Sequence, residues 1–255
     1  PVRKLELEGL DYSAGREIFM ARGSFSGSDG EWKLIIDYYN GNPLALELAA
    51  NYIKKECNCN ISVFLQKKDK PIFDKIHNLL DWHFERLSIS EKQISYWLAI
   101  NREPVSSEEL KKDILSRKDR KKLSSALFSL QEKFPIEIRQ EKEHREYSLQ
   151  PVLVDYLTER LVEKAIDEIL NEEIEILNSH SLLKALIQDY VRESQVKFIL
   201  KPIWEELEYE LENKASIEKQ LNKIISLLRE GLFTKRGYTA GNILNLLCQN
   251  KSKLR

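Results

Sequence analysis

The sequence predicts a mostly α-helical chain in three parts: a small helical bundle, a winged-helix module with three helices and a β-hairpin wing, and a C-terminal helical arm. Charged residues make up 32% of its 255 residues, while only 9 Gly and 7 Pro are present. This balance is typical of helix-rich proteins with charged outer faces. Apolar residues recur at helical spacing along most of the chain. We place the three parts at residues 1–70, 71–160 and 161–255.

The sequence of the first part predicts four helices, which are separated by turn-forming residues. A capping box formed by Ser28 and Glu31 opens the second helix, since each side chain can bond the other residue's backbone N–H. Leu44, Leu48 and Tyr52 lie on one wide apolar face of the third helix, so we expect this helix to be central in the bundle. The expected helices span residues 11–23, 28–41, 43–55 and 61–66.

The turn between the second and third helices is the most informative stretch of the chain. Asn40 and Gly41 close one helix, because both tolerate a left-handed backbone. Asn42 can cap the next helix, and Pro43 fits its first position, where a missing N–H costs nothing. An ordinary joint between two helices would carry the same signals, and this alternative stays open.

The second part has the order of a winged-helix module. An apolar helix over residues 73–87 leads into it, and a second helix turns Ile94, Trp97 and Leu98 inward. A short extended piece then precedes a capped helix, a third helix follows, and residues 134–149 alternate as a hairpin does. The helices and extended piece of the module lie at residues 90–99, 104–110 and 121–133.

The last third of the chain is predicted to be all helix. Its turns contain Asn213, Gly231 and Gly237 to Gly241, which suggests antiparallel helix pairs. No fixed period is strong enough to indicate a solenoid. The expected helices span residues 151–176, 180–200, 203–211, 217–229 and 243–247.

The Gly41-Asn42-Pro43-Leu44 stretch, taken with Leu10-Asp11-Tyr12 and Trp32-x-x-Ile35-Ile36, resembles the Gly-x-Pro-Leu motif of NB-ARC nucleotide-binding proteins. These belong to the STAND class of signalling NTPases. The likeness is closest to bacterial members that carry WD or pentapeptide repeats, and it covers residues 5 to 160. Residues 161 to 255 look like the helical spacer that precedes such repeats.

The resemblance implies a nucleotide-contacting corner. In the family the Pro of this motif lines the adenine pocket, so Pro43, with Gly41 and Leu44 beside it, is the implied contact. Many relatives also place a His on the β-phosphate of ADP after the wing. Gln150 stands at the matching position here. Its amide can donate one hydrogen bond to a phosphate, or its side chain can simply cap the following helix.

The sequence offers no catalytic argument. No Gly-x-x-x-x-Gly-Lys-Ser/Thr loop occurs in it, and a P-loop is what holds the β and γ phosphates in such hydrolases. Asp37 ends an apolar run that imitates a magnesium-binding strand, but the run has helical spacing, so we interpret Asp37 as a helix residue. The glycines and serines of residues 23–30 form an interhelical loop without the lysine of a phosphate cradle.

These observations predict a non-catalytic regulatory segment of a signalling ATPase. It would lie C-terminal to a P-loop domain, contribute to an ADP or ATP pocket, and relay the nucleotide state to C-terminal repeats. ADP or ATP would be bound in the parent protein, and we expect none on this chain alone. The expected partners are the P-loop domain and the repeat sensor, with self-association left open. A helical protein-interaction scaffold is an alternative from another class.

A DNA-binding winged-helix regulator is the other alternative. Residues 116–122 form a basic run before the third helix of the module, where such proteins contact phosphates. Asp119 inside the run dilutes the charge, and the whole chain has 40 basic and 41 acidic residues. A charge run of this kind is usually a solvated loop, and we expect no nucleic-acid partner.

The remaining composition predicts a cytoplasmic protein without metal. Cys57, Cys59 and Cys248 are odd in number and lack zinc-ligand spacing, so we expect free thiols. The four histidines have no ligand spacing with them. No run of 18 apolar residues and no signal-peptide pattern occur, so no membrane partner is expected.

Overall fold

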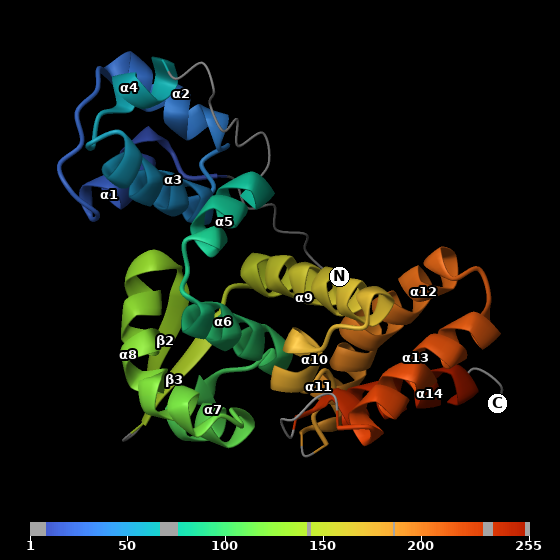
Figure 1. Ribbon diagram of the computed structural model, residues 1–255. Helices are drawn as coiled ribbons and strands as arrows, with labels where there is room; N and C mark the ends of the chain where they lie inside the picture. The colour runs from blue at the N-terminus through green and yellow to red at the C-terminus, as the bar shows by residue number, and fades with distance from the viewer. Residues whose placement is uncertain (1–8, 67–75, 142–143, 186, 232–236, 253–255) are drawn as a thin grey trace, which may run out of the picture. The chain divides into compact units, whose positions relative to one another are not determined.

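The computed structural model describes residues 9–66, 76–141, 144–185, 187–231 and 237–252 (Figure 1). It is mostly α-helical with one three-stranded antiparallel sheet, which confirms the predicted fold class. The helices are α1 Tyr12–Met20, α2 Asp29–Tyr38, α3 Pro43–Glu56, α4 Ile61–Gln66, α5 Ile76–Glu85, α6 Ile89–Asn101, α7 Ser107–Asp113, α8 Arg117–Lys133, α9 Pro151–Asn171, α10 Glu175–Ser179, α11 Asp189–Gln195, the π-helical turn η1 Val196–Leu200, α12 Lys201–Glu210, α13 Lys214–Arg229 and α14 Thr239–Ser252. The strands are β1 Val105–Ser106, β2 Ile136–Glu141 and β3 His144–Leu149.

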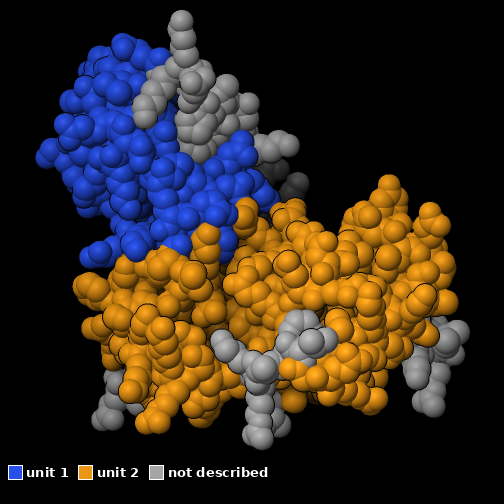
Figure 2. Space-filling view, in the orientation of Figure 1, with its two compact units in different colours: residues 1–87, 131–135 blue, residues 88–130, 136–255 orange. Residues whose placement is uncertain are grey.

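The chain folds into two compact units, coloured separately in Figure 2. Helix α5 belongs to the first unit, although the sequence placed it with the winged-helix part. The C-terminal arm and most of the winged-helix part share the second unit. The three predicted domain ranges stay a prediction. The residues of the two units are 1–87 with 131–135, and 88–130 with 136–255.

The first unit is built around helix α3. Its residues from Leu44 to Ile53 are nearly all buried, which confirms the central position that the apolar pattern predicted. Beside it, the Phe19 ring meets the rings of Phe25 and Trp32 edge to face, at 5.3 and 5.2 Å between centroids. Such pairs add stabilisation beyond the area that they bury. The capping box at the start of α2 is also present as predicted.

The winged-helix part has the element order α6, β1, α7, α8, β2, β3. The strand order in its sheet is β1–β3–β2, so β3 is central and Tyr147 pairs with Val105 on one side and Ile138 on the other. Ser106 ends β1 and caps α7 through a capping box with Glu109. The predicted extended piece, capped helix and hairpin are therefore confirmed.

Helix α8 begins earlier than the sequence indicated. We expected residues 116–122 to precede the helix as a solvated run, but α8 starts at Arg117. Ser116 sits just before it, and its hydroxyl accepts a hydrogen bond from the Asp119 backbone N–H at 3.3 Å. Lys and Arg are good helix formers on an exposed face. The basic residues therefore form the first turns of the helix.

Residues 180–200 are the clearest error of the secondary-structure prediction. The described residues from 180 to 188 are not helical, and α11 begins only at Asp189. Two side chains explain this. The Leu182 N–H donates to Asn242 Oδ1 at 2.9 Å, and the Lys184 N–H donates to Gln195 Oε1 at 3.0 Å. These backbone groups are satisfied by side chains, so a helix is not needed to pair them.

The arm and the winged-helix part are joined by a largely buried polar network, in which the side chains of Lys184 and Asp113 are 18% and 14% exposed. The Lys184 ammonium lies 2.7 Å from Asp113 Oδ2 and 2.7 Å from Asn101 Oδ1. The Tyr238 hydroxyl donates to the Asp113 carbonyl at 2.8 Å. Gln195 Nε2 donates to the Ile100 carbonyl, also at 2.8 Å. Because buried polar groups are costly when unpaired, this network fixes the arm against α6 and α7.

A second link between the arm and α6 is His180. Its imidazole is fully buried between the rings of Tyr96 and Trp97. In the neutral tautomer with Nε2 protonated, Nε2–H donates to the Gln93 carbonyl at 2.9 Å. Nδ1 lies 2.9 Å from the Ser179 hydroxyl, whose single hydrogen is shared between Nδ1 and the Glu175 carbonyl at 2.8 Å. Burial lowers the pKa of His180 to about 4, while the Gln93 carbonyl acts in the opposite direction.

We expect the second unit to lose stability in mild acid because of His180. The unfolded chain binds a proton near pH 6.5, whereas the folded pKa is about 4. The unfolded state is therefore favoured as the pH falls below 6.5, and about 2 kcal/mol of unfolding free energy should be lost between pH 7 and pH 5. Denaturant unfolding at both pH values should show this loss, and His180→Phe should reduce it. An equal loss in the variant would contradict the assignment.

Candidate functional site

The predicted corner in the first unit is a close approach of two backbone segments. Helix α2 ends in a left-handed turn, with φ of 50° at Asn40 and 62° at Gly41. The Leu10 N–H donates to the Gly41 carbonyl at 2.8 Å. A Cβ added at Gly41 would overlap the backbone oxygen and nitrogen of Leu10. The corner therefore needs glycine for its conformation and for its contact.

The start of α3 is built as the sequence predicted. The Asn42 side chain accepts from the Ala45 N–H at 3.1 Å, and Pro43 takes the first helical position. Pro43 is exposed, so its ring is available to a ligand. Leu44 is only 4% exposed and Gly41 is buried, so these two residues lie in the interior and offer almost no surface to a ligand.

The residues of this corner suit the base of a nucleotide but not its phosphates. An exposed proline ring offers an apolar surface for adenine, but residues 40–46 contain no basic side chain that could hold phosphate. Tyr39, at the end of α2, is buried, and its hydroxyl has no hydrogen-bond partner among the described residues. Buried tyrosine hydroxyls usually find a partner. Burial raises the pKa of Tyr39 above its ordinary value.

Gln150 lies in the second unit, at the N-cap position of α9. Its side chain makes no capping hydrogen bond, so the alternative of a capping side chain is wrong. The Gln150 carbonyl instead accepts from the N–H groups of Leu153 and Val154. Pro151 at the first helical position has no N–H to be capped. Nothing in this geometry tests a role in phosphate binding.

Two further sequence interpretations concern the start of the chain. Asp37 is an exposed residue of α2, which confirms that it belongs to a helix. The loop between α1 and α2 is held in place by two backbone hydrogen bonds of Ser26. The Ser26 N–H donates to the Cys59 carbonyl, and the Ser26 carbonyl accepts from the Ile61 N–H, both at 2.9 Å. The loop therefore joins two helices, as the sequence indicated.

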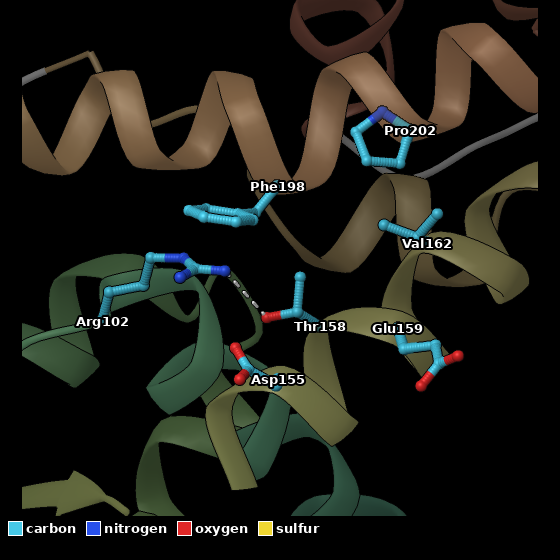
Figure 3. Close-up of a pocket in the computed structure, with 7 residues that line it drawn as sticks. All are labelled: Arg102, Asp155, Thr158, Glu159, Val162, Phe198 and Pro202. Atoms are coloured by element: carbon cyan, nitrogen blue, oxygen red, sulfur yellow. Dashed lines mark hydrogen bonds between the residues drawn. The ribbon is translucent and has the colours of Figure 1, made fainter. Parts of the chain in front are cut away.

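The second unit contains a pocket that the sequence did not reveal (Figure 3). It has a volume of about 380 Å³, within the range of small-molecule sites. Arg102 enters it from the end of α6, and α9 forms one side. Phe198 of η1 and Pro202 of α12 form the opposite wall. Its lining residues are Arg102, Asp155, Thr158, Glu159, Val162, Phe198 and Pro202.

Arg102 is the central polar group of this pocket. It closes α6 in a left-handed conformation, with φ of 59°. Its Nη2 donates to the Thr158 hydroxyl at 3.3 Å, and its Cζ lies 4.6 Å from the centroid of the Phe198 ring. Its Nε is buried and has no acceptor among the described residues. Burial lowers the pKa of Arg102, while the nearby Asp155 acts in the opposite direction.

The opposite wall is shaped by a proline. Pro202 cannot donate a backbone hydrogen bond, and inside a helix its ring conflicts with the carbonyl four residues earlier, which is that of Phe198. The helix widens there into η1, and the Lys201 N–H reaches back to the Val196 carbonyl. The sequence signal for this π-helical turn was therefore Pro202, a proline inside an apolar helical pattern. We placed a helix break near it and did not expect a π-helical turn.

The chain is similar to a known WD repeat-containing protein. No family model matches the chain. It is 36% identical to an uncharacterized WD repeat-containing protein from Nostoc sp. (strain PCC 7120 / SAG 25.82 / UTEX 2576), over 282 residues. The match covers 97% of this chain and 22% of that protein. The chain thus spans about a fifth of the length of the relative that it matches.

The described part of the chain shows neither a membrane-spanning helix nor a cluster of metal ligands. Within that part of the chain, no helix has both the length and the apolar character that crossing a membrane requires. Nor do three or more His, Cys, Asp or Glu side chains gather in the described ranges as metal ligands would. Cys57, Cys59 and Cys248 all lie in the described ranges, and no disulfide joins them.

Proposed function

We propose that this chain is the regulatory segment of a STAND-class signalling ATPase. The observation that carries the proposal is the corner at Gly41 to Leu44. A left-handed glycine, a capping Asn42 and the position of Pro43 at the start of α3 leave the proline ring of the Gly-x-Pro-Leu sequence exposed, which supports a contact with adenine. The WD repeat-containing relative supports the repeat-bearing type. In this proposal the parent protein binds ADP or ATP mainly through a P-loop domain.

The packing of the second unit supports a relay. Lys184, Asp113 and Asn101 tie the arm to the winged-helix part through hydrogen bonds of 2.7 Å. In this proposal the two parts move together when the nucleotide changes, so that movement of the winged-helix part reaches C-terminal repeats through the arm. A relay of this kind needs an element with two arrangements, and both the nucleotide site and the C-terminal repeats must shift the equilibrium between them. The chain alone is proposed to be non-catalytic.

Pro43→Ala in the parent protein tests the nucleotide role. We expect its affinity for ADP to fall at least tenfold, because the ring that packs on adenine is removed. Stability should change by no more than about 1 kcal/mol, since the first helical position tolerates alanine. Calorimetry of ADP binding measures the first quantity and denaturant unfolding the second.

A matched control for this test is Pro104→Ala, a change of an exposed proline in the second unit. It should leave ADP affinity unchanged. Unaltered ADP affinity in Pro43→Ala would contradict the nucleotide role of the corner. A loss of affinity in both variants would point to a general change in the protein and would equally count against a specific role for Pro43.

DNA binding remains a second candidate because α8 displays its basic residues. Arg117, Lys118, Arg120, Lys121 and Lys122 are all exposed in the first turns of this helix. In winged-helix regulators the third helix of the module enters the major groove. Arg139 and Arg145 are exposed on the neighbouring wing. This surface is therefore more basic than the overall charge of the chain suggests.

We expect no tight binding of duplex DNA at moderate salt. Asp119 lies within the basic turns, and Glu137 forms an ion pair with Arg139 at 3.6 Å. A gel-shift series at rising salt, with Lys118→Gln and Lys121→Gln as variants, measures the binding. A tight complex that weakens steeply with salt, and weakens further in both variants, would favour the DNA-binding regulator.

A further inference from the structure

We propose that the pocket around Arg102 binds a small organic acid with one carboxylate and an apolar body. The carboxylate would pair with the guanidinium, and the apolar body would pack on the opposite wall beside Phe198. The inference concerns the second unit alone. It does not depend on the nucleotide role proposed for the corner in the first unit.

The guanidinium of Arg102 lacks an anionic partner and is suited to bind one. No carboxylate lies within salt-bridge distance of it among the described residues, although Asp155 is close enough to affect its pKa. Its one side-chain hydrogen bond goes to a neutral hydroxyl, that of Thr158. A half-buried cation with an unfilled donor at Nε has lost hydration without gaining an anionic partner. A carboxylate would supply charge-assisted hydrogen bonds at this point.

The neighbouring acids restrict the charge of the ligand. Asp155 and Glu159 also line the pocket, and both are exposed. In Figure 3, Glu159 points away from Arg102, while Asp155 lies on the same side as Arg102. Among the lining residues, two negative charges stand against the one positive charge of Arg102, and this balance disfavours a doubly charged phosphate. A single carboxylate on the guanidinium is the anion that this arrangement accepts best.

The apolar wall gives the ligand its second feature. The Phe198 ring is 42% exposed, and Val162 and Pro202 lie on the same pocket. Only part of the ring is occupied, by Arg102 and by the Lys197 ammonium at 4.9 Å from its centroid. An aromatic or aliphatic group there would remove apolar surface from water. A volume of about 380 Å³ has room for a group of this size.

The backbone on both sides of the pocket has uncommon geometry. Arg102 takes a left-handed conformation where glycine is the usual helix-ending residue. Phe198 lies in a π-helical turn, a feature found frequently at functional sites. These two features position the charged group and the aromatic ring against each other. Both features support a ligand site at this position.

Ligand-observed NMR on the full chain tests the proposal with phenylacetate. We expect saturable binding with a dissociation constant of about 1 mM, because a ligand with so few atoms can make only a few contacts. Phenylethylamine, which has the same ring and the opposite charge, should bind at least tenfold more weakly. Binding of the amine in preference to the acid would overturn the proposal, because the acids would then determine the ligand. Absence of saturable phenylacetate binding would overturn it as well.

Variants locate the binding in the pocket. Arg102→Gln should weaken phenylacetate binding at least tenfold, and Phe198→Leu should weaken it severalfold. Arg86→Gln is a matched control, since Arg86 stacks on Trp82 with Cζ 3.7 Å from the ring centroid in the first unit. It should leave binding unchanged. Equal affinity of Arg102→Gln and the unaltered chain would place the ligand elsewhere and overturn the proposal.

A folding measurement and two further variants distinguish loss of binding from loss of structure. Circular dichroism shows whether each variant is folded. If Arg102→Gln fails to fold, Arg102→Lys keeps the positive charge and loses the planar fork, and its phenylacetate affinity should fall while its preference for the acid over the amine is retained. Loss of that preference would count against the site. Pro43→Ala should not affect phenylacetate binding, which separates this inference from the nucleotide role.

Discussion

Replacing Trp97 by alanine should lower the free energy of unfolding of the second unit by about 3 to 5 kcal/mol, the usual cost of removing a large aromatic side chain from a core. Trp97 is only 2% exposed. Its ring lies 4.8 Å from the His180 ring and 5.7 Å from the Tyr238 ring, measured between centroids. The substitution would therefore open a cavity between α6 and the arm and would remove two ring contacts.

Chemical denaturation followed by circular dichroism measures the loss. Tyr209→Ala is a suitable control, because Tyr209 is an aromatic residue of the same unit and is 79% exposed. It should change the unfolding free energy by less than about 0.5 kcal/mol. A change below about 1 kcal/mol for Trp97→Ala would mean that α6 and the arm do not share the core described above.

Local signals in the sequence were sufficient for most helices. The capping box of Ser28 and Glu31 begins α2 where expected, and α4 has the predicted bounds. Both depend on residues close together in the chain. Helical spacing also showed that Trp97 faces inward. It could not show that His180 and Tyr238 would be its ring partners, because periodicity carries no information about contacts between distant segments.

The errors occur where tertiary contacts replace local rules. The amides of Leu182 and Lys184 bond the side chains of Asn242 and Gln195, which the apolar pattern of residues 180–200 could not reveal. The pocket depends on Arg102 and Phe198, which are almost a hundred residues apart and meet only in the fold. By contrast, the corner at Gly41 to Leu44 could be predicted, because its conformation follows from adjacent residues.

Replacing Gly41 by alanine should destabilise the first unit by about 3 kcal/mol. Gly41 has φ of 62°, and a left-handed conformation costs about 1 kcal/mol or more for a residue with a side chain. The new Cβ would also overlap the Leu10 backbone. Relief of the overlap would displace this segment and break the 2.8 Å hydrogen bond from the Leu10 N–H to the Gly41 carbonyl. Forced overlaps of this kind cost roughly 1 to 3 kcal/mol.

Denaturant unfolding of Gly41→Ala, Gly30→Ala and Pro43→Ala separates structure from binding at the corner. Gly30 lies in α2 with open space around its Cβ position, so alanine there should be neutral or stabilising. Pro43→Ala should likewise unfold close to the unaltered chain. A large loss confined to Gly41→Ala would show that glycine holds the turn and that Pro43 is not needed for stability, as the nucleotide contact proposed for Pro43 requires. Similar stability of all three variants would mean that the approach of Leu10 to Gly41 does not stabilise the fold, and the corner would lose its structural basis.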